Sequence, residues 1–137
     1  MTSSETKPAL DGLRVMVVED ELLLAMELEE HLQEEGCTVI GPVARPVKAL
    51  RLLETEHPDA AVLDLNLNGE RSTAVADALV ERGVPFVVVT GYVDMPFDEP
   101  ALRSAPRLGK PFRSEDLIRM LTEACGNGRR ADHRSAR

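Results

Sequence analysis

Three consecutive acidic residues, Glu19, Asp20 and Glu21, directly follow an apolar run in the segment "VMVVEDE". Carboxylates about 4 Å apart repel one another by a few kcal/mol at an effective dielectric constant of about 20. Crowded oxygen ligands without His or Cys suit a hard divalent cation such as Mg²⁺ or Mn²⁺. The alternative interpretation is an acidic first turn of a helix, which the helix dipole favours. Residues elsewhere in the chain decide between the two.

Three further reactive side chains stand at or near the ends of other apolar runs. Asp64 comes near the end of one such run, Thr90 ends a second, and Lys110 follows a third, short one. A lysine and a hydroxyl opposite a metal are what a transferring phosphoryl group needs, because its oxygens carry the negative charge. A carboxylate can itself be the nucleophile and form an acyl phosphate. Together these side chains predict metal-assisted phosphoryl transfer.

Alternating apolar runs and amphipathic segments position these side chains. The stretch 91–105 contains two prolines and no sustained period, so we expect a loop with at most a turn or two of helix there. Elsewhere the pattern predicts strands at 13–18, 37–40, 60–65, 86–90 and 107–109, and helices at 21–35, 46–56, 72–82 and 114–125.

Strands that are almost continuously Val and Leu, separated by helices, predict an α/β fold with a parallel sheet covered on both faces. Crossover connections are right-handed, so all strands point the same way and their carboxyl ends meet at one edge. That edge collects Glu19, Asp20, Asp64, Thr90 and Lys110. We therefore prefer the metal and phosphoryl interpretation to that of an acidic helix start.

Composition narrows the classes of function. The chain has 137 residues, is 43% hydrophobic and carries a formal net charge of −8, which fits one domain with a single core. An acidic body argues against nucleic acid as a partner, because phosphates are recognised by clustered Lys and Arg. No apolar run approaches the roughly 20 residues of a membrane span, and no apolar signal region is seen. We expect a cytoplasmic protein without membrane or nucleic-acid partners.

Both ends of the chain differ in composition from the body. Residues 1–12 are polar, and residues 126–137, "GNGRRADHRSAR", are basic and rich in small residues. Such segments bury too little apolar surface to offset the entropy of ordering. We expect flexible segments at 1–12 and 126–137 flanking a domain at 13–125.

Four motifs, "VVED", "AVLDLNLNG", "VVVTGY" and "LGKPF", stand in this order at the strand ends. They resemble the receiver domain of two-component response regulators over residues 13–124. The resemblance implies a doubly wound five-stranded parallel sheet, flavodoxin-like with strand order 2-1-3-4-5, whose fourth helix is here short or missing. It implies Asp64 as phosphoacceptor, Thr90 as a ligand of the phosphoryl oxygen, and Lys110 as the partner of Asp64 and the phosphate.

The resemblance also implies a cofactor, Mg²⁺, with Mn²⁺ as a substitute. Asp20 would be a direct ligand and Glu19 would act through a bound water. Asp64 and the backbone carbonyl of Asn66 would complete the set. Glu19 stands where most receivers carry a first aspartate, which should leave metal binding intact.

The sequence departs from the usual pattern at Arg107, which stands three positions before Lys110, where an aromatic switch residue is usual. "FVVVTGY" resembles a subfamily whose fourth strand reads Phe-x-x-x-Thr-Gly-Tyr and whose kinases are typically of the HWE type. This implies Tyr92 and the loop 91–105 as reporters of phosphorylation. Gly91 would leave room for the phosphoryl group. Asn66 and Tyr92 would flank the attacking water and set the rate of autodephosphorylation.

The resemblance further implies the partners. A histidine kinase, HWE-type by the subfamily, or a phosphotransfer protein would supply the phosphoryl group, and a protein partner would receive the signal. About a dozen residues follow the last helix, so we expect a single-domain response regulator that acts through protein contacts. Self-catalysed phosphotransfer and autodephosphorylation would be its only reactions. Many receivers dimerise through the region of the fourth helix and fifth strand. The sequence of this region differs here from the usual pattern, so we expect a monomer.

Two alternatives stay open. A pseudo-receiver adaptor would not be phosphorylated; Asp64, Thr90 and Lys110 argue against it, whereas Arg107 keeps it open. A haloacid-dehalogenase-type phosphohydrolase also uses an aspartyl nucleophile with Mg²⁺. That class carries Asp-x-Asp on its first strand, whereas the nearest candidate here is "DLNL" around Asp64, with Asn66 where the general acid should be.

Overall fold

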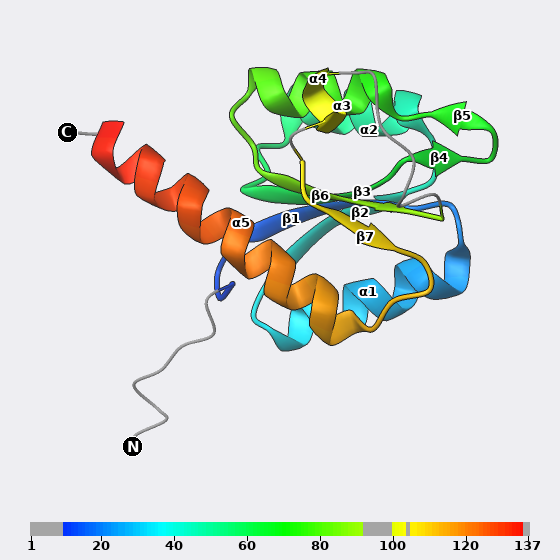
Figure 1. Ribbon diagram of the computed structural model, residues 1–137, viewed down its shortest axis with the longest axis horizontal. Helices are drawn as coiled ribbons and strands as arrows, with labels where there is room; N and C mark the ends of the chain where they lie inside the picture. The colour runs from blue at the N-terminus through cyan, green and yellow to red at the C-terminus, as the bar shows by residue number, and fades with distance from the viewer. Residues whose placement is uncertain (1–9, 92–99, 104, 136–137) are drawn as a thin grey trace.

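The computed structural model describes residues 10–91, 100–103 and 105–135 (Figure 1). Five parallel strands form one sheet in the order β2-β1-β3-β6-β7, which confirms the predicted doubly wound, flavodoxin-like topology. A separate antiparallel pair, β4 and β5, accounts for the gap in the numbering of this sheet. The strands are β1 (Arg14–Val18), β2 (Thr38–Val43), β3 (Ala60–Asp64), β4 (Asn66–Leu67), β5 (Glu70–Arg71), β6 (Phe86–Thr90) and β7 (Arg107–Gly109).

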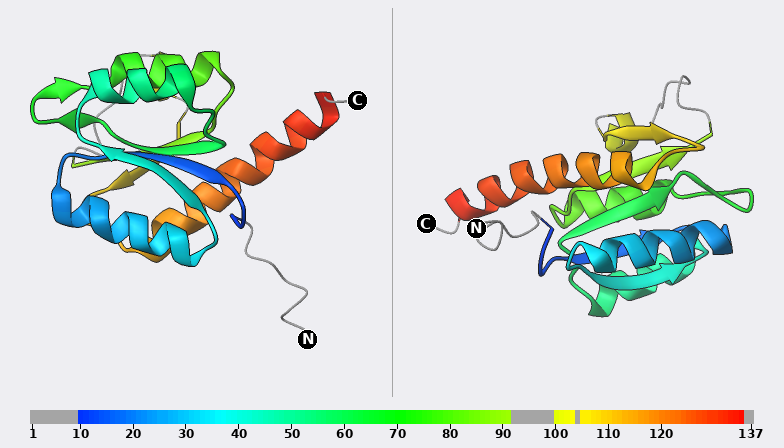
Figure 2. Two further views of the ribbon diagram at one scale, coloured as in Figure 1. Left: turned by 180° about the vertical axis from the view of Figure 1, so that it is seen from behind. Right: turned by 90° about the horizontal axis from the view of Figure 1, so that it is seen from below.

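Helices cover both faces of the sheet. α1 and α5 lie on one face, and α2, α3 and the short α4 lie on the other (Figures 1 and 2). Among the described residues no helix is both long enough and apolar enough to cross a membrane. The helices are α1 (Leu22–Glu34), α2 (Pro46–Thr55), α3 (Thr73–Glu81), α4 (Pro100–Arg103) and α5 (Ser114–Ser135).

The two helical layers create two hydrophobic clusters, one on each side of the sheet. Alternate residues of a strand point to opposite faces, so Met16 and Leu63 pack with α2 and α3, whereas Val15 and Val62 pack with α1 and α5. Every residue of β3 and β6 is buried, which is why these strands read as continuous apolar runs.

The register of the sheet brings the strand ends to one edge. Val18 is opposite Leu63, Asp64 is opposite Val89, and Thr90 is opposite Gly109. The residues that follow β1 and β7 therefore start from the same edge as Asp64. The alignment of the strand ends thus sets the position of the site.

Two element boundaries differ from the sequence prediction. β2 continues through Gly41 and Pro42 to Val43 instead of ending at residue 40. Pro42 has no N–H to donate to a neighbouring strand. Because β2 is an edge strand, the hydrogen bonds between the central strands do not depend on this donor.

Helix α5 runs to Ser135, well beyond 125. Gly126 and Gly128 disfavour a helix, but the Arg and Ala residues that follow are strong helix formers.

The amino-terminal end of the described chain contributes to the core. Leu10 falls within the segment 1–12 that the composition predicts to be flexible, yet its side chain is fully buried in the cluster beneath α1 and α5. Its backbone oxygen accepts a hydrogen bond from the N–H of Leu13 (3.0 Å). A single apolar residue after a polar run gives no periodic signal, so only the folded chain shows that it belongs to the core. The fourth helix, by contrast, is short as predicted, with four residues.

Candidate functional site

Glu19 is the most buried of the three acids that follow β1, with 2% of the residue exposed. One carboxylate oxygen, Oε2, accepts a hydrogen bond from the N–H of Glu21 (3.0 Å) and faces the ammonium of Lys110 (3.1 Å). The other, Oε1, is buried without a partner among the described residues. A buried, unpartnered carboxylate oxygen is costly. Oε1 of Glu19 is thus an acceptor that a cation or a hydrogen-bond donor would satisfy.

Asp64 ends β3 and is 4% exposed. Its Oδ1 accepts the N–H of Asn66 (3.1 Å), and its Oδ2 accepts the Nζ of Lys110 (2.9 Å). Asp64 therefore lies in contact with Lys110, as the strand-end argument predicts. These two contacts hold the carboxylate in a defined orientation at the mouth of the site.

Lys110, directly after β7, connects the acids. Its Nζ lies 2.9 Å from Asp64, 3.1 Å from Glu19 and 2.8 Å from Glu21. These carboxylates raise the pKa of Lys110 well above its ordinary value, against the opposing effect of burial. The sequence interpretation missed Glu21 as a member of this group. The signal was present as the third acid of "EDE", but spacing alone does not show which acid faces the lysine.

The acidic residues have the chemistry of a divalent-cation site. Glu19, Asp20 and Asp64 each have one carboxylate oxygen that lies within 4.8 Å of such an oxygen of the other two residues. Burial is the main cause that raises the pKa of Glu19 from 4.5 to about 7. A cation beside the unpartnered Oε1 would offset that cost. The donor set, oxygen only, fits Mg²⁺.

The β4–β5 hairpin forms one wall of the site. Its turn residues, Asn68 and Gly69, both have positive φ (51° and 86°). Asn-Gly favours such a turn, a sequence signal that the strand prediction missed. The N–H of Asn68 donates to Oδ2 of Asp20 (2.9 Å), and the N–H of Gly69 donates to the side-chain oxygen of Asn66 (3.0 Å). The hairpin thus places Asn66 and Asp20 on one side of the site.

Thr90 and Gly91 border the same depression as the acids and Lys110, and this depression measures about 270 Å³. Thr90, 2% exposed, ends β6, and its backbone oxygen accepts the N–H of Lys110 (2.8 Å). A Cβ added to Gly91 would meet no described atom within 4 Å. Arg107 is half-buried at the start of β7, and Tyr92 lies outside the described residues. The depression is lined by Asp20, Glu21, Asp64, Asn66, Asn68, Gly69, Thr90, Gly91 and Lys110.

Ser72 supports the site from behind and was not predicted. It is fully buried, and its hydroxyl donates to the backbone oxygens of Asp64 and Leu65, the latter at 2.8 Å. Its own N–H also donates to the oxygen of Leu65 (3.0 Å). Ser72 thereby joins the start of α3 to the end of β3 and helps to fix the backbone of Asp64. A serine directly before a helix is usually interpreted as an N-cap residue. The sequence therefore does not reveal that Ser72 contacts the backbone at the end of β3.

The burial of Glu19 predicts a pH dependence of stability in metal-free protein. The folded protein keeps the Glu19 proton up to about pH 7, whereas the unfolded chain loses it near 4.5. The free energy of unfolding should therefore fall as pH rises through this window. We expect Glu19→Gln to be more stable than wild type by about 1–2 kcal/mol at pH 8, and equal to it at pH 5.

Urea unfolding in EDTA at the two pH values measures this difference. The control is Glu30→Gln, an exposed residue of α1, which should match wild type at both. A gain for Glu19→Gln that is the same at pH 5 and pH 8 would show that burial of the charge is not its cause.

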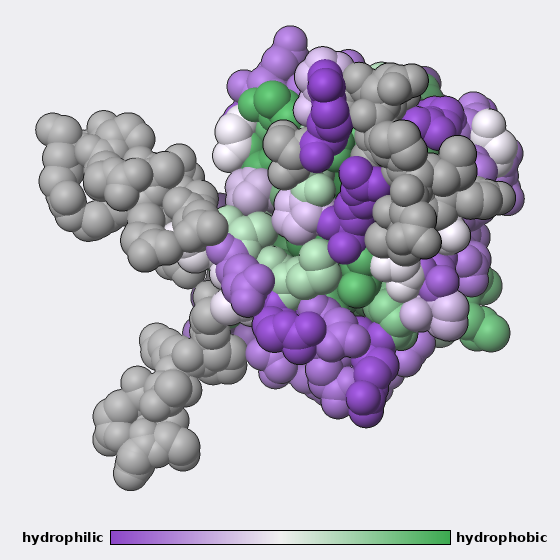
Figure 3. Space-filling view, viewed as in Figure 1, coloured by the Kyte–Doolittle hydropathy of each residue, from purple (hydrophilic) through white to green (hydrophobic). Residues whose placement is uncertain are grey.

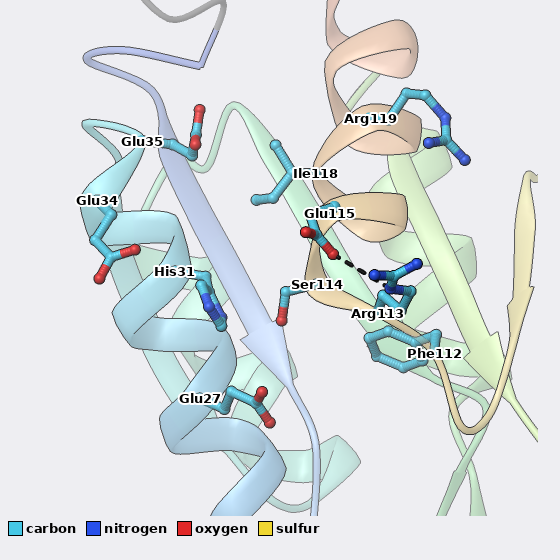
Figure 4. A pocket seen from close by; sticks show the side chains of 10 residues that line it. All are labelled: Glu27, His31, Glu34, Glu35, Phe112, Arg113, Ser114, Glu115, Ile118 and Arg119. Carbon is cyan, nitrogen blue, oxygen red and sulfur yellow. Dashed lines mark ion pairs between the residues drawn. The ribbon is translucent and has the colours of Figure 1, made fainter.

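A larger hollow, of about 680 Å³, lies away from the acidic site between α1 and α5 (Figure 4). Glu27, Glu34 and Glu35 line its α1 side and Arg113 and Arg119 its α5 side. Arg113 pairs with Glu115 of its own segment (3.6 Å), and among the described residues the acidic group that could hold a metal ion lies elsewhere, at Glu19, Asp20 and Asp64. Size therefore does not identify the functional site; the residue chemistry does.

The motifs, the sheet order and the Asp64–Lys110 contact agree with one family. Residues 15–122 match the response regulator receiver domain. The chain belongs to the receiver domain family. Members of this family are signalling domains of two-component systems.

Known receivers resemble the chain in sequence and structure. The transcriptional regulatory protein PdtaR of Mycobacterium tuberculosis is 32% identical over 108 residues, which cover 77% of this chain and 53% of PdtaR. The chain thus spans about half the length of this curated relative. The solution structure of SdrG from Sphingomonas melonis is 40% identical, covers 83% of this chain and 96% of SdrG, and has a TM-score of 0.70.

A third comparison bears on the metal. The receiver domain of the sensor histidine kinase PA1611 from Pseudomonas aeruginosa carries a magnesium ion coordinated in its active-site cleft. It is 26% identical to this chain, with a TM-score of 0.71, and the match covers 84% of this chain and 98% of that domain. The acidic cluster of Glu19, Asp20 and Asp64 is thus found in a chain whose structural relative holds Mg²⁺.

Proposed function

We propose that this receiver accepts a phosphoryl group on Asp64 from a phosphohistidine, in a reaction that requires Mg²⁺, and signals the change to a protein partner. The observation that carries the proposal is the contact of the Lys110 ammonium with Asp64 beside carboxylate oxygens of Glu19, Asp20 and Asp64 that lie within 4.8 Å of one another. A nucleophilic carboxylate, a fixed cation and metal ligands are the parts that phosphoryl transfer needs.

Asp20, Glu19, Asp64 and the backbone carbonyl of Asn66 are the residues that would hold Mg²⁺, with Glu19 acting through a water. When bound, the ion supplies positive charge that neutralises the phosphoryl oxygens. The magnesium in the PA1611 receiver and the unpartnered Oε1 of Glu19 support this assignment. Mn²⁺, which also favours oxygen ligands, is expected to substitute.

In the proposed reaction, a carboxylate oxygen of Asp64 attacks the phosphorus in line. The P–O bond forms as the P–N bond of the donor breaks, and the electron pair of that bond stays on the imidazole nitrogen of the donor. Lys110 and the N–H of Asn66 hold the carboxylate in place, which lowers the entropic part of the barrier. Lys110 also offers positive charge to the phosphoryl oxygens.

The product adds negative charge at the sheet edge, and Thr90 is proposed to bind a phosphoryl oxygen there. Its backbone is tied to that of Lys110, so β6 and β7 respond together. Gly91 leaves the space for the group. With Arg107 at the usual aromatic position, we propose Tyr92 and the loop after Gly91 as the surface that changes. Asn66 and Tyr92 are proposed to set the rate of autodephosphorylation.

The proposed donor is a histidine kinase of the HWE type or a phosphotransfer protein. Leu22, Leu23 and Met26 of α1 are exposed by 71%, 81% and 55%. Apolar atoms are visible at the edge of the molecule where α1 begins (Figure 3). Exposed apolar groups beside an active site suit contact with a protein, and we propose this turn as part of the donor's contact. A monomer in the cytoplasm is the state in which we expect the exchange.

The second candidate function is an adaptor that is not phosphorylated, which Arg107 favours because the usual switch aromatic is missing. Intact mass measurement after incubation with acetyl phosphate separates the two. We expect one phosphoryl group to be gained in Mg²⁺, none in EDTA, and the adduct to be cleaved by hydroxylamine, as an acyl phosphate should be. Absence of an adduct from both acetyl phosphate and a phosphorylated HWE-type kinase would establish the adaptor.

A further inference from the structure

The ammonium of Lys110 has three N–H donors. Its Nζ lies within hydrogen-bond distance of three carboxylates: 2.8 Å from Glu21, 2.9 Å from Asp64 and 3.1 Å from Glu19. Each donor therefore has one acceptor. If Lys110 is to contact a phosphoryl oxygen while it stays in place, one of these contacts must be given up.

The three partners differ in what their release would cost. The side chain of Glu19 is fully buried and that of Asp64 is 5% exposed, whereas that of Glu21 is 61% exposed. Removing the cation from a buried carboxylate leaves an unpaired buried charge, which is costly. A carboxylate that is mostly in water regains its hydration, and an exposed ion pair is worth little. Glu21 is thus the partner whose contact is the least costly to break.

The backbone at Glu21 allows the side chain to leave without disturbing the site. Its N–H donates to Oε2 of Glu19 (3.0 Å), which anchors the main chain. Glu21 is the N-cap of α1, yet its side chain makes no capping hydrogen bond. The contact with Lys110 is therefore independent of the start of the helix.

We propose that Glu21 is a positioning residue that occupies the third donor of Lys110 in the resting protein and yields it to the incoming phosphoryl group. The competition lowers the affinity of the site for that group. This inference rests on the proposed function. It assigns Glu21 a role that Glu19, Asp20 and Asp64 cannot share, because their carboxylates are needed at the metal and at the reaction.

The test compares Glu21→Ala and Glu21→Asp with wild type. The probe is beryllofluoride, which mimics a phosphoryl group on a carboxylate, and calorimetry in Mg²⁺ measures its dissociation constant. Aspartate keeps the charge but is one methylene too short for the contact. We expect both variants to bind beryllofluoride about threefold to fivefold more tightly, the value of an exposed ion pair. Glu21→Gln, whose amide oxygen can still accept the bond, should fall between them and wild type.

Glu29→Ala is the matched control, because Glu29 is an acid of α1 near the site without a contact to Lys110 among those described; its affinity should equal that of wild type. Glu21→Asp loses the contact with Lys110 but keeps the negative charge. If Glu21→Ala bound beryllofluoride more tightly and Glu21→Asp bound it like wild type, the charge of Glu21 and not its contact with Lys110 would be the cause, and the inference would be overturned. Unchanged binding in both variants would also overturn it, with the proposed function intact. Wild type that binds no beryllofluoride would refute the proposed function and, with it, this inference.

Discussion

Asp64→Asn should take up no phosphoryl group from acetyl phosphate or from a phosphorylated kinase, a loss of at least about 100-fold in the rate of incorporation. The amide keeps the size of the side chain, but its single oxygen can accept only one of the two hydrogen bonds, from Lys110 and from the N–H of Asn66, that the two carboxylate oxygens accept. It lacks the nucleophilic oxygen charge. The variant therefore separates the chemistry of Asp64 from its place in the fold.

The control is Asp77→Asn, which removes a carboxylate from the exposed face of α3, away from the site. Intact mass spectra of both variants, with circular dichroism to show that they are folded, make the comparison. Asp77→Asn should match wild type. Phosphoryl uptake by Asp64→Asn at the wild-type rate would place the acceptor elsewhere and end the assignment.

Lys110→Met should slow phosphoryl uptake by about 100-fold, because one fixed positive charge at the phosphoryl oxygens is lost. It should also lower the free energy of unfolding in EDTA at pH 8 by about 2–3 kcal/mol, because Glu19 and Asp64 are left as buried charges without a partner. Methionine keeps the apolar stem of the lysine, so packing changes little. The pKa of Lys110 lies above its ordinary value, so wild type retains the charge throughout this range.

Mg²⁺ should reduce the stability deficit of Lys110→Met, because a bound cation replaces part of the missing positive charge. Urea unfolding with and without Mg²⁺ measures this, and Lys48→Met, at an exposed position of α2, is the control. A deficit in Lys110→Met that Mg²⁺ does not change would show that the lysine and the metal do not share the same carboxylates.

The Asp64→Asn and Lys110→Met variants both test a trade-off between the stability of the fold and the function of the site. Three acids, Glu19, Glu21 and Asp64, contact the ammonium of Lys110, and Asp20 lies close to two of them, so carboxylates outnumber the lysine at this site. Burial and, after it, the neighbouring carboxylate of Asp64 raise the pKa of Glu19, whereas the N–H of Glu21 and the charge of Lys110 lower it. A chain optimised for stability alone would carry fewer carboxylates here. This number of carboxylates is what the proposed divalent-cation site would require.

The sheet and the principal site residues follow from the sequence, because both depend on local patterns. Buried strands must be apolar throughout, helices must be amphipathic, and right-handed crossovers align the strand ends at one edge. That reasoning places Asp64 and Lys110, 46 residues apart, at the same edge, whereas the strand order and the pairing of these two side chains were implied by the resemblance to receiver domains. The short α4 is similarly local, since prolines and a lost period interrupt a helix wherever they occur.

Other features of the protein could not be predicted from the sequence, because they depend on tertiary contacts between residues. The burial of Leu10, the support of Asp64 by Ser72 and the length of α5 depend on contacts or on a balance of small propensities, and no periodic pattern reveals them. The acids after Val18 are the clearest case. Their types predicted a cation site from sequence alone, because oxygen ligands suit Mg²⁺. Only the tertiary structure shows that Glu19 is buried, that Glu21 is exposed, and that Lys110 contacts both. Adjacent side chains leave the backbone in different directions, and burial gives them different chemistry.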